Sequence, residues 1–281
     1  VLAGRLTEYS ADFLHTATAA TYGEAFGGKA GETVKVRDGL YSLELWHGPT
    51  CAFKDYALQL MPKLLVEAKK MLGRTETTRI LVATSGDTGK AALAGYADLD
   101  GIEIEVFYPN DGTSEIQHLQ MATQKGETVL EKRGIRLSSA NSINWGRLVP
   151  QIVYYFYAYF RLAEQGAVEW GKPVDFCVPT GNFGDILAGY YAKQMGLPVG
   201  RLVCASNKNN VLTDFLRTGT YDARRTFYKT TSPSMDILIS SNLERLLYHV
   251  SGSSEKVAGW MQELSATGKY TVDAETLAKI Q

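Results

Sequence analysis

Several stretches of the chain share one order of features, in which an apolar run leads into a turn with glycine and then into a helical pattern. VDFCVPT (174–180) leads through GNFG into DILAGYYAKQMG (185–196). RILVATS (79–85) leads in the same way into GKAALAGYA (89–97). Strands that alternate with helices form crossover units, in which the strands run parallel. The chain is therefore predicted to have an α/β fold with a mostly parallel sheet.

Further segments extend this pattern on both sides. EIEVFYP (103–109) and RLVCAS (201–206) are predicted strands, and a helix is expected at 115–123. Gly196 is predicted to cap the end of the helix that begins at residue 185. A long helix over 144–164 is expected to join two sheet regions.

Composition excludes several functional classes. The chain has 281 residues and a net charge of −1. This balance argues against a nucleic-acid partner, because a protein that binds nucleic acid needs a basic surface. No apolar run approaches the roughly 18 residues of a membrane span. The three cysteines, Cys51, Cys177 and Cys204, lie far apart, which fits a reducing interior. The first residues show no signal-peptide pattern. We expect a soluble cytoplasmic protein without a membrane partner.

The stretch HGPTCAFKDYALQL (47–60) contains a lysine in apolar surroundings. Lys54 lies at the predicted start of a helix, because the apolar residues after it recur at helical spacing: Leu58, Met61, Leu65 and Ala68. The helix dipole disfavours a cation there and lowers its pKa, and a neutral amine can attack a carbonyl carbon. The alternative is a surface lysine paired with Asp55. Pro62 predicts a kink in the helix.

Two glycine-containing turns are candidate anion sites. In PTGNFGDILAGYYA (179–192), Gly181 and Gly184 would let the backbone approach a phosphate at the start of a helix. Asp185 is expected to cap that helix or meet a neighbouring group rather than face the phosphate. In ATSGDTGKAAL (83–93), hydroxyl and N–H groups could hold a carboxylate. Each turn could instead be an ordinary strand-to-helix connection with caps.

The segment NSINWGR (141–147) is rich in hydrogen-bonding side chains and suits a polar ligand group, although Asn and Ser also cap helices. The chain has no H-E-x-x-H motif, no Cys/His cluster at metal-binding spacing and no G-x-S-x-G motif. Metal-dependent hydrolysis and triad chemistry are therefore not expected, and no metal ligand is predicted.

These segments together resemble the threonine synthases, pyridoxal-phosphate (PLP) enzymes with the tryptophan-synthase-β-like fold. The resemblance covers essentially the whole chain, in five stretches that occur in the same order: LELWHGPTCAFKD, LVATSGDTGKAA, NSINWGR, VPTGNFGDILAGYYAK and TTSPSMDILISSNLERLL. It implies an α/β fold with two doubly wound, mostly parallel sheet domains, known as fold type II.

The resemblance also implies roles for individual residues. Lys54 matches the lysine that holds PLP as a Schiff base and serves in catalysis. The cofactor loop matches Gly181, Asn182, Phe183, Gly184 and Asp185. The substrate loops match Ser85, Gly86, Asp87, Thr88, Gly89, Ser142 and Asn144. Lys90 is a further candidate for the substrate phosphate.

Two domains are expected from the same resemblance. Residues 1–78 plus 151–281 would form a large PLP-binding domain, incomplete at both ends, and 79–150 a smaller substrate-side domain. Family members carry a segment before residue 1 and a long portion after Gln281, where the partner of the pyridine nitrogen is expected. They also carry a glycine- and aspartate-containing stretch between the equivalents of Val129 and Leu130, so a segment is expected to be missing near 129–130.

The implied reaction converts O-phospho-L-homoserine and water to L-threonine and phosphate, the last step of threonine biosynthesis. The implied partner is this small-molecule substrate, and the protein would be a monomer or homodimer. One alternative is another fold type II PLP lyase such as threonine dehydratase, against which HGPT-x-AFKD and NSIN argue. Another is a phosphate-binding fragment without activity.

Overall fold

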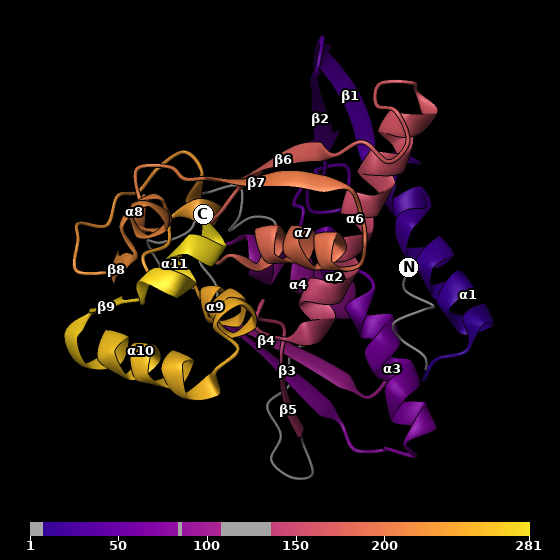
Figure 1. Cartoon of the computed structure of the whole chain (residues 1–281). Helices are drawn as coiled ribbons and strands as arrows, with labels where there is room; N and C mark the ends of the chain where they lie inside the picture. Colours follow the sequence, from indigo (N-terminus) through magenta and orange to yellow (C-terminus); the bar gives the residue numbers. More distant parts are fainter. Residues whose placement is uncertain (1–7, 84–85, 108–135) are drawn as a thin grey trace. The chain divides into compact units, whose positions relative to one another are not determined.

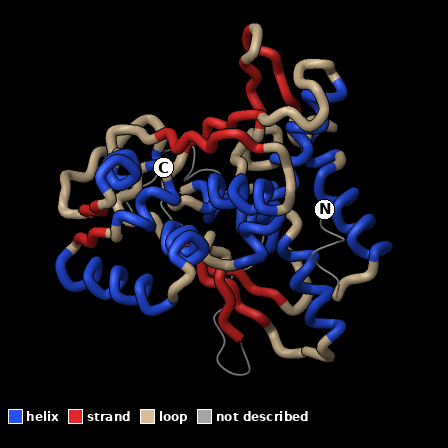
Figure 2. The backbone as a smooth tube through the Cα atoms, in the orientation of Figure 1, coloured by secondary structure: helices blue, strands red, loops and turns tan. Residues whose placement is uncertain are grey.

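The structure is a computed structural model of the chain, and it describes residues 8–83, 86–107 and 136–281 (Figure 1). Two units divide the chain by its internal contacts, unit 1 being Val1–Trp170 and unit 2 being Gly171–Gln281. Both units contain helices and strands, and Figure 2 colours the backbone by these elements. Among the described residues, no helix is both long and apolar enough to cross a bilayer.

Unit 1 combines a parallel sheet, a hairpin and several helices. Its helices are α1 (Ala11–Tyr22), the 3-10 helix η1 (Glu24–Phe26), α2 (Asp55–Leu58), α3 (Met61–Met71), α4 (Asp87–Tyr96) and α6 (Trp145–Glu164). Its strands are β1 (Glu32–Arg37), β2 (Leu40–Glu44), β3 (Thr78–Ala83), β4 (Ile102–Phe107) and β5 (Arg136–Ser139). β3 lies between β4 and β5 and runs parallel to both, while β1 and β2 form an antiparallel hairpin.

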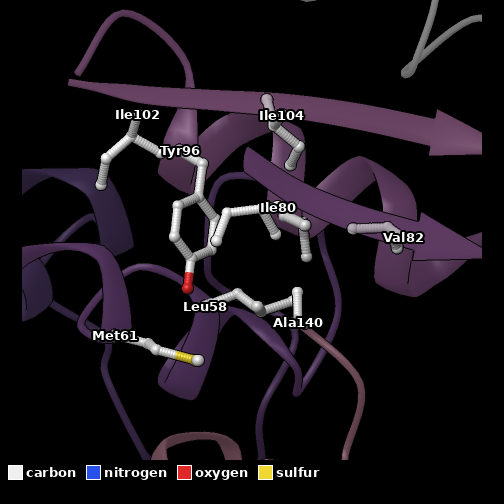
Figure 3. Close-up of a cluster of buried hydrophobic side chains, with 10 residues drawn as sticks. Leu58, Met61, Ile80, Val82, Tyr96, Ile102, Ile104 and Ala140 are labelled. Carbon is white, nitrogen blue, oxygen red and sulfur yellow. The ribbon is translucent and has the colours of Figure 1, made fainter. Parts of the chain in front are cut away.

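The core of unit 1 forms where α4 and α2 cover β3 and β4. Buried side chains of the two strands meet those of the helices in one cluster (Figure 3), which includes Leu58, Met61, Ile80, Val82, Tyr96, Ile102, Ile104 and Ala140. Each fully buried aliphatic side chain contributes about 1.5–3 kcal/mol. A Cβ on Gly95 of α4 would lie 2.0 Å from the carbonyl oxygen of Leu58, so α2 and α4 meet backbone to backbone. This contact fixes the short helix that follows Lys54.

Unit 2 contains a parallel strand pair and a group of helices. Its helices are α7 (Gly184–Gln194), α8 (Val211–Thr218), the 3-10 helix η2 (Pro233–Met235), α9 (Leu243–Ser251), α10 (Ser254–Thr267) and α11 (Ala274–Ile280). Its strands are β6 (Val174–Pro179), β7 (Val199–Ala205), β8 (Thr220–Asp222) and β9 (Lys269–Thr271). β6 and β7 pair in parallel and are connected through α7, while β8 and β9 pair antiparallel.

The structure confirms the predicted α/β pattern in the described residues. The predicted strands at 79–85, 103–109, 174–180 and 201–206 correspond to β3, β4, β6 and β7, and the helices predicted from 89, 185 and 144 correspond to α4, α7 and α6. Gly196 follows Met195, the C-cap residue of α7, and adopts φ +95°, as a capping glycine does. The helix expected at 115–123 lies outside the described residues.

The prediction of one kinked helix around Pro62 is wrong. The chain forms two helices, α2 and α3, and Pro62 lies in the first turn of α3. Proline is favoured there because the first N–H groups of a helix have no intrahelical acceptor. The predicted division into domains at residues 78 and 150 stays a prediction, and each unit is described below by itself.

Candidate active site

Lys54 is buried directly before α2. The residue is 6% exposed, and its Nζ lies 3.8 Å from Asp87 Oδ2 and 5.6 Å from the centre of the Phe53 ring. The alternative of a surface lysine paired with Asp55 does not hold. Asp55 is fully buried and accepts hydrogen bonds from the Thr50 N–H (2.9 Å) and the Thr50 hydroxyl (2.7 Å).

Burial changes the acid–base chemistry of this amine. Desolvation lowers the pKa of Lys54 from its ordinary 10.5 to about 8, and the positive charges of Arg147 and Lys90 act in the same direction. The carboxylate of Asp87 opposes the shift without cancelling it. Near neutral pH a usable fraction of the amine is therefore unprotonated, which a nucleophile or a general base requires.

The surroundings of Lys54 carry more positive than negative charge. Asp87 is shared, because its Oδ1 lies 3.0 Å from the Nζ of Lys90 while its Oδ2 faces Lys54. Arg147, the third cation, is 1% exposed, and desolvation lowers its pKa to about 10. Among the described residues, Lys54 thus has two buried cations, Lys90 and Arg147, and one carboxylate, Asp87, as its charged neighbours, and an anionic ligand would offset the excess positive charge.

Arg147 is a buried cation near Lys54 to which the sequence predictions gave no role of its own. One of its terminal nitrogens donates to the carbonyl oxygen of Ala140, and its Nε has no hydrogen-bond partner among the described residues. A buried guanidinium normally uses its donors fully. The available signal was a charged residue that directly precedes the apolar run Leu148–Val149–Pro150 at the start of a helix.

The turn that leads to Lys54 is anchored at both ends. A Cβ on Gly48 would lie 2.6 Å from Asp55 Oδ2, so glycine lets this carboxylate reach Thr50. His47 Nε2 lies 2.7 Å from Glu44 Oε2 and 3.5 Å from Glu32 Oε2, which ties the turn to the β1–β2 hairpin. We interpret this group as a structural contact.

The predicted carboxylate loop lies at the start of α4. Gly86 adopts φ +148°, a conformation that favours glycine, and Asp87 opens the helix. Thr88 and Gly89 follow in its first turn. Of this loop, the structure brings Asp87 next to Lys54; Ser85 lies outside the described residues.

The segment before α6 has mixed roles. The side chain of Asn144 caps α6 by accepting from the Gly146 N–H (2.9 Å), so the capping alternative is realised for this residue. Ser142 is buried and its hydroxyl lies 3.3 Å from Asn141 Oδ1. Arg147 lies one turn further along the same helix.

The predicted phosphate turn lies in unit 2, where it connects β6 to α7. Phe183 precedes the helix with φ +67°, which is costly for a bulky residue. A left-handed residue at a helix start turns successive N–H groups toward one side and forms an anion-binding concavity. The Gly184 N–H donates to Asn182 Oδ1 (3.2 Å), and Asp185 lies in the first turn of α7.

Each unit, taken by itself, offers one kind of binding group. A buried amine with a pKa of about 8 can bond covalently to a carbonyl carbon. The N-terminus of the 11-residue helix α7 offers backbone donors and a favourable dipole for a phosphate.

Comparisons with known proteins agree with this chemistry. The family profile described as "Pyridoxal-phosphate dependent enzyme" matches residues 30–281. The human protein named threonine synthase-like 1 is 40% identical over 297 residues, which cover 92% of this chain and 40% of the human one. Threonine synthase of Pseudomonas aeruginosa is 43% identical over 255 residues, covering 82% of this chain and 53% of that protein.

A solved structure shows the same fold. The crystal structure of PLP-bound threonine synthase from Brucella melitensis superposes with a TM-score of 0.84 and 36% identity, covering 96% of this chain and 61% of that one.

The chain spans about half the length of the curated relatives it matches. The alignment of 297 residues is longer than the whole chain of 281, so it requires gaps within this chain. A missing segment near 129–130, which lies outside the described residues, stays a prediction. With the family match across most of its length and the fold type II architecture of its structural relative, the chain belongs to the pyridoxal-phosphate dependent enzymes, whose cofactor is pyridoxal 5'-phosphate.

Proposed function

We propose that this chain carries the catalytic residues of a threonine synthase, which converts O-phospho-L-homoserine and water to L-threonine and phosphate. The observation that carries the proposal is Lys54, a buried amine with a pKa lowered to about 8 beside two further buried cations. Relatives named threonine synthase, about 40% identical to this chain, support it. In this proposal the enzyme is cytoplasmic and acts as a monomer or homodimer.

In the proposed enzyme, Lys54 holds PLP covalently and residues 181–185 bind its phosphate. When bound, PLP supplies an electron sink that stabilises negative charge at the substrate Cα. The substrate amine displaces Lys54, which leaves a free amine beside the substrate. Because its pKa is about 8, this amine can accept the proton of Cα near neutral pH and, after releasing that proton to solvent, one of Cβ.

The same amine can return protons later in the reaction. Phosphate leaves from Cγ with the electron pair of the C–O bond, while the electrons left at Cβ form a double bond to Cγ. Lys54 is suited to give a proton to Cγ as this double bond shifts to lie between Cα and Cβ. The oxygen of water then adds at Cβ, and its proton is released as Cα regains one. Asp87, 3.8 Å from the amine, stabilises Lys54 while it carries a proton.

Buried positive charge suits a substrate with two anionic groups. We propose that Lys90 and Arg147 balance the substrate phosphate, with Ser142 and Asn144 as further polar contacts. The Arg147 Nε, which has no partner among the described residues, is a donor ready for such a group. The start of α4, residues 85–89, is proposed to receive the carboxylate, since a helix N-terminus favours an anion.

Two measurements test the proposed function. Borohydride reduction of the protein with PLP should attach the cofactor to the peptide that contains Lys54, as seen by mass spectrometry. The Lys54→Ala variant should lose this label, while Lys63→Ala, which removes a half-buried lysine after α2, should keep it. A label elsewhere, or none, would contradict the assignment of Lys54.

The second measurement identifies the reaction. The proposal predicts phosphate release from O-phospho-L-homoserine and little ammonia release from threonine. The reverse pattern would indicate a threonine dehydratase. PLP attachment at Lys54 without either product would indicate that the residues of this chain hold the cofactor but do not suffice for turnover.

A further inference from the structure

The stretch TTSPSMDILISSNLERLL (230–247) is part of the family resemblance, yet none of its residues has a role in the chemistry above. In unit 2, residues 234–242, which we call the tether segment, pack against the glycine turn at Gly181 and Asn182. The tether segment leads directly into α9, whereas the glycine turn leads into α7.

Two residues of the tether segment bind the carbonyl groups of the turn. The Ser240 hydroxyl donates to the carbonyl oxygen of Gly181 (2.6 Å). Asn242 donates twice to the carbonyl oxygen of Asn182, from its backbone N–H (3.0 Å) and from its Nδ2 (3.1 Å). Ser240 is 7% exposed and Asn242 is 0% exposed, so these bonds form away from competing water.

Further hydrogen bonds hold the tether segment itself. The Tyr221 hydroxyl of β8 donates to the carbonyl oxygen of Leu238 (2.9 Å) and accepts from the Ser240 N–H (2.8 Å). Asn242 Oδ1 accepts from a terminal nitrogen of Arg245 (2.8 Å). Ser240 and Asn242, the two residues that donate to the turn, are therefore themselves held in place by other hydrogen bonds.

The turn has little space in which to move against this support. A Cβ on Gly181 would lie 3.2 Å from the Ser234 carbonyl oxygen, from Met235 Cα and from Ile237 Cδ1. Contacts that close are tighter than ordinary van der Waals distances, so only glycine fits without displacing the segment.

These contacts set the direction of the N–H groups in the turn. In a trans peptide the N–H points opposite to the C=O, and none of the described peptide bonds is cis. Because the carbonyls of Gly181 and Asn182 point toward the tether segment, the N–H groups of Asn182 and Phe183, in the same two peptides, point away from it.

We propose that Ser240 and Asn242 are positioning residues that hold the glycine turn in its phosphate-binding geometry. They act through the two carbonyls and do not touch the ligand. The inference rests on the proposed function, because it takes the PLP phosphate to be the group that residues 181–185 bind.

The test compares PLP with pyridoxal, which lacks the phosphate, on the full chain with Ser240→Ala. Both dissociation constants are measured by absorbance titration, and the ³¹P resonance of bound PLP is recorded. Loss of one buried hydrogen bond predicts about tenfold weaker PLP binding. Pyridoxal binding should stay unchanged, and the ³¹P shift should move. The matched control is Thr276→Val, which removes a buried hydroxyl that bonds to Asp273 at the start of α11.

The outcomes separate the two proposals. If the wild-type chain binds PLP no better than pyridoxal, the phosphate role of the turn fails, and with it the basis of the inference. If the wild type prefers PLP and Ser240→Ala keeps that preference in full, the positioning role is overturned. A merely structural role would weaken both ligands alike, and Ser240→Ala and Thr276→Val would then behave the same.

Discussion

At the scale of single residues, neighbouring positions in the chain have opposite surroundings. Lys54 is buried beside the carboxylate of Asp87, which lies far from it in the sequence. The adjacent residue Asp55 instead accepts hydrogen bonds from neutral donors. Burial raises the pKa of Asp55, while the hydrogen bonds from Thr50 and Gln59 lower it. The two charges therefore do not neutralise each other, and the lysine stays available for chemistry.

The lowered pKa of Lys54 predicts a specific pH dependence of stability. Its pKa is about 8 in the folded state and 10.5 otherwise, so between these values the unfolded chain binds more protons and stability rises with pH. Below pH 8 the burial of the protonated Lys54 amine destabilises the folded chain by its full amount, about 3 kcal/mol. Lys54→Met should therefore be more stable than the wild type at pH 7 by up to that amount, and the difference should vanish toward pH 10.5.

Urea unfolding between pH 7 and 10.5, on protein free of cofactor, measures this difference. Lys70→Met serves as the control, because that side chain is 71% exposed and its removal should give a difference that does not change with pH. A constant gap between Lys54→Met and the wild type would show that the amine has an ordinary pKa.

Single residues were predictable only where their own neighbourhood in the sequence carried the signal. Lys54 stood out because it precedes an apolar helical pattern. Asp87 was predicted as a residue of the substrate loop, but its pairing with Lys54 was not, since the packing of α2 on α4 brings the two together. The bonds of Ser240 and Asn242 to the glycine turn join residues about 60 positions apart and depend on the same kind of long-range packing.

At the scale of elements, two helical glycines illustrate how packing overrides helix propensity. Gly95 of α4 meets the backbone of Leu58, whereas Gly259 of α10 has open space where a Cβ would be. Alanine is the better helix former by about 1 kcal/mol at either position. The two sites should therefore respond to the same substitution in opposite directions.

Gly95→Ala should destabilise the protein by about 1–3 kcal/mol or more, because α2 must move away from α4. Gly259→Ala should stabilise it by up to about 1 kcal/mol. Urea unfolding of both variants checks the signs, and hydrogen exchange locates each change in its own helix. A stabilising Gly95→Ala would mean that α2 and α4 are not in direct backbone contact.

Helices and strands were predictable where the pattern of apolar residues and the turn residues beside it indicated the same boundaries. β3, β6 and β7 are short apolar runs that end at turn residues, a pattern typical of buried strands. The β1–β2 hairpin was not predicted, although Asp38–Gly39 between two alternating runs favours a tight hairpin turn. The break between α2 and α3 was not predictable, because the apolar spacing continues across it.

At the scale of the whole molecule, each unit has its own packed interior. Unit 1 is built around the cluster on β3 and β4, and in unit 2 Tyr221 and Tyr270 stack 5.3 Å apart across β8 and β9. Sequence patterns indicated the α/β class but not which segments cluster into a unit. That division depends on contacts between segments distant in sequence.

A ligand that binds only the folded chain should raise the stability of the whole molecule. At free PLP 100-fold above its dissociation constant, the gain is about 2.7 kcal/mol. We expect the Tm to rise with PLP concentration and to rise less with pyridoxal at the same concentration, because the start of α7 then contributes no phosphate contact. Differential scanning calorimetry measures both series, and equal shifts would exclude a phosphate site.

The tether segment also has a consequence for the rate of cofactor capture. Because Ser240 and Asn242 hold the glycine turn in place within the folded chain, PLP would meet a turn that is already ordered. Without the Ser240 hydroxyl, the turn would sample other conformations. If only about a tenth of molecules then held the competent one, this alone would lower the apparent affinity about tenfold. PLP would then associate more slowly, because most molecules would first have to reorder the turn.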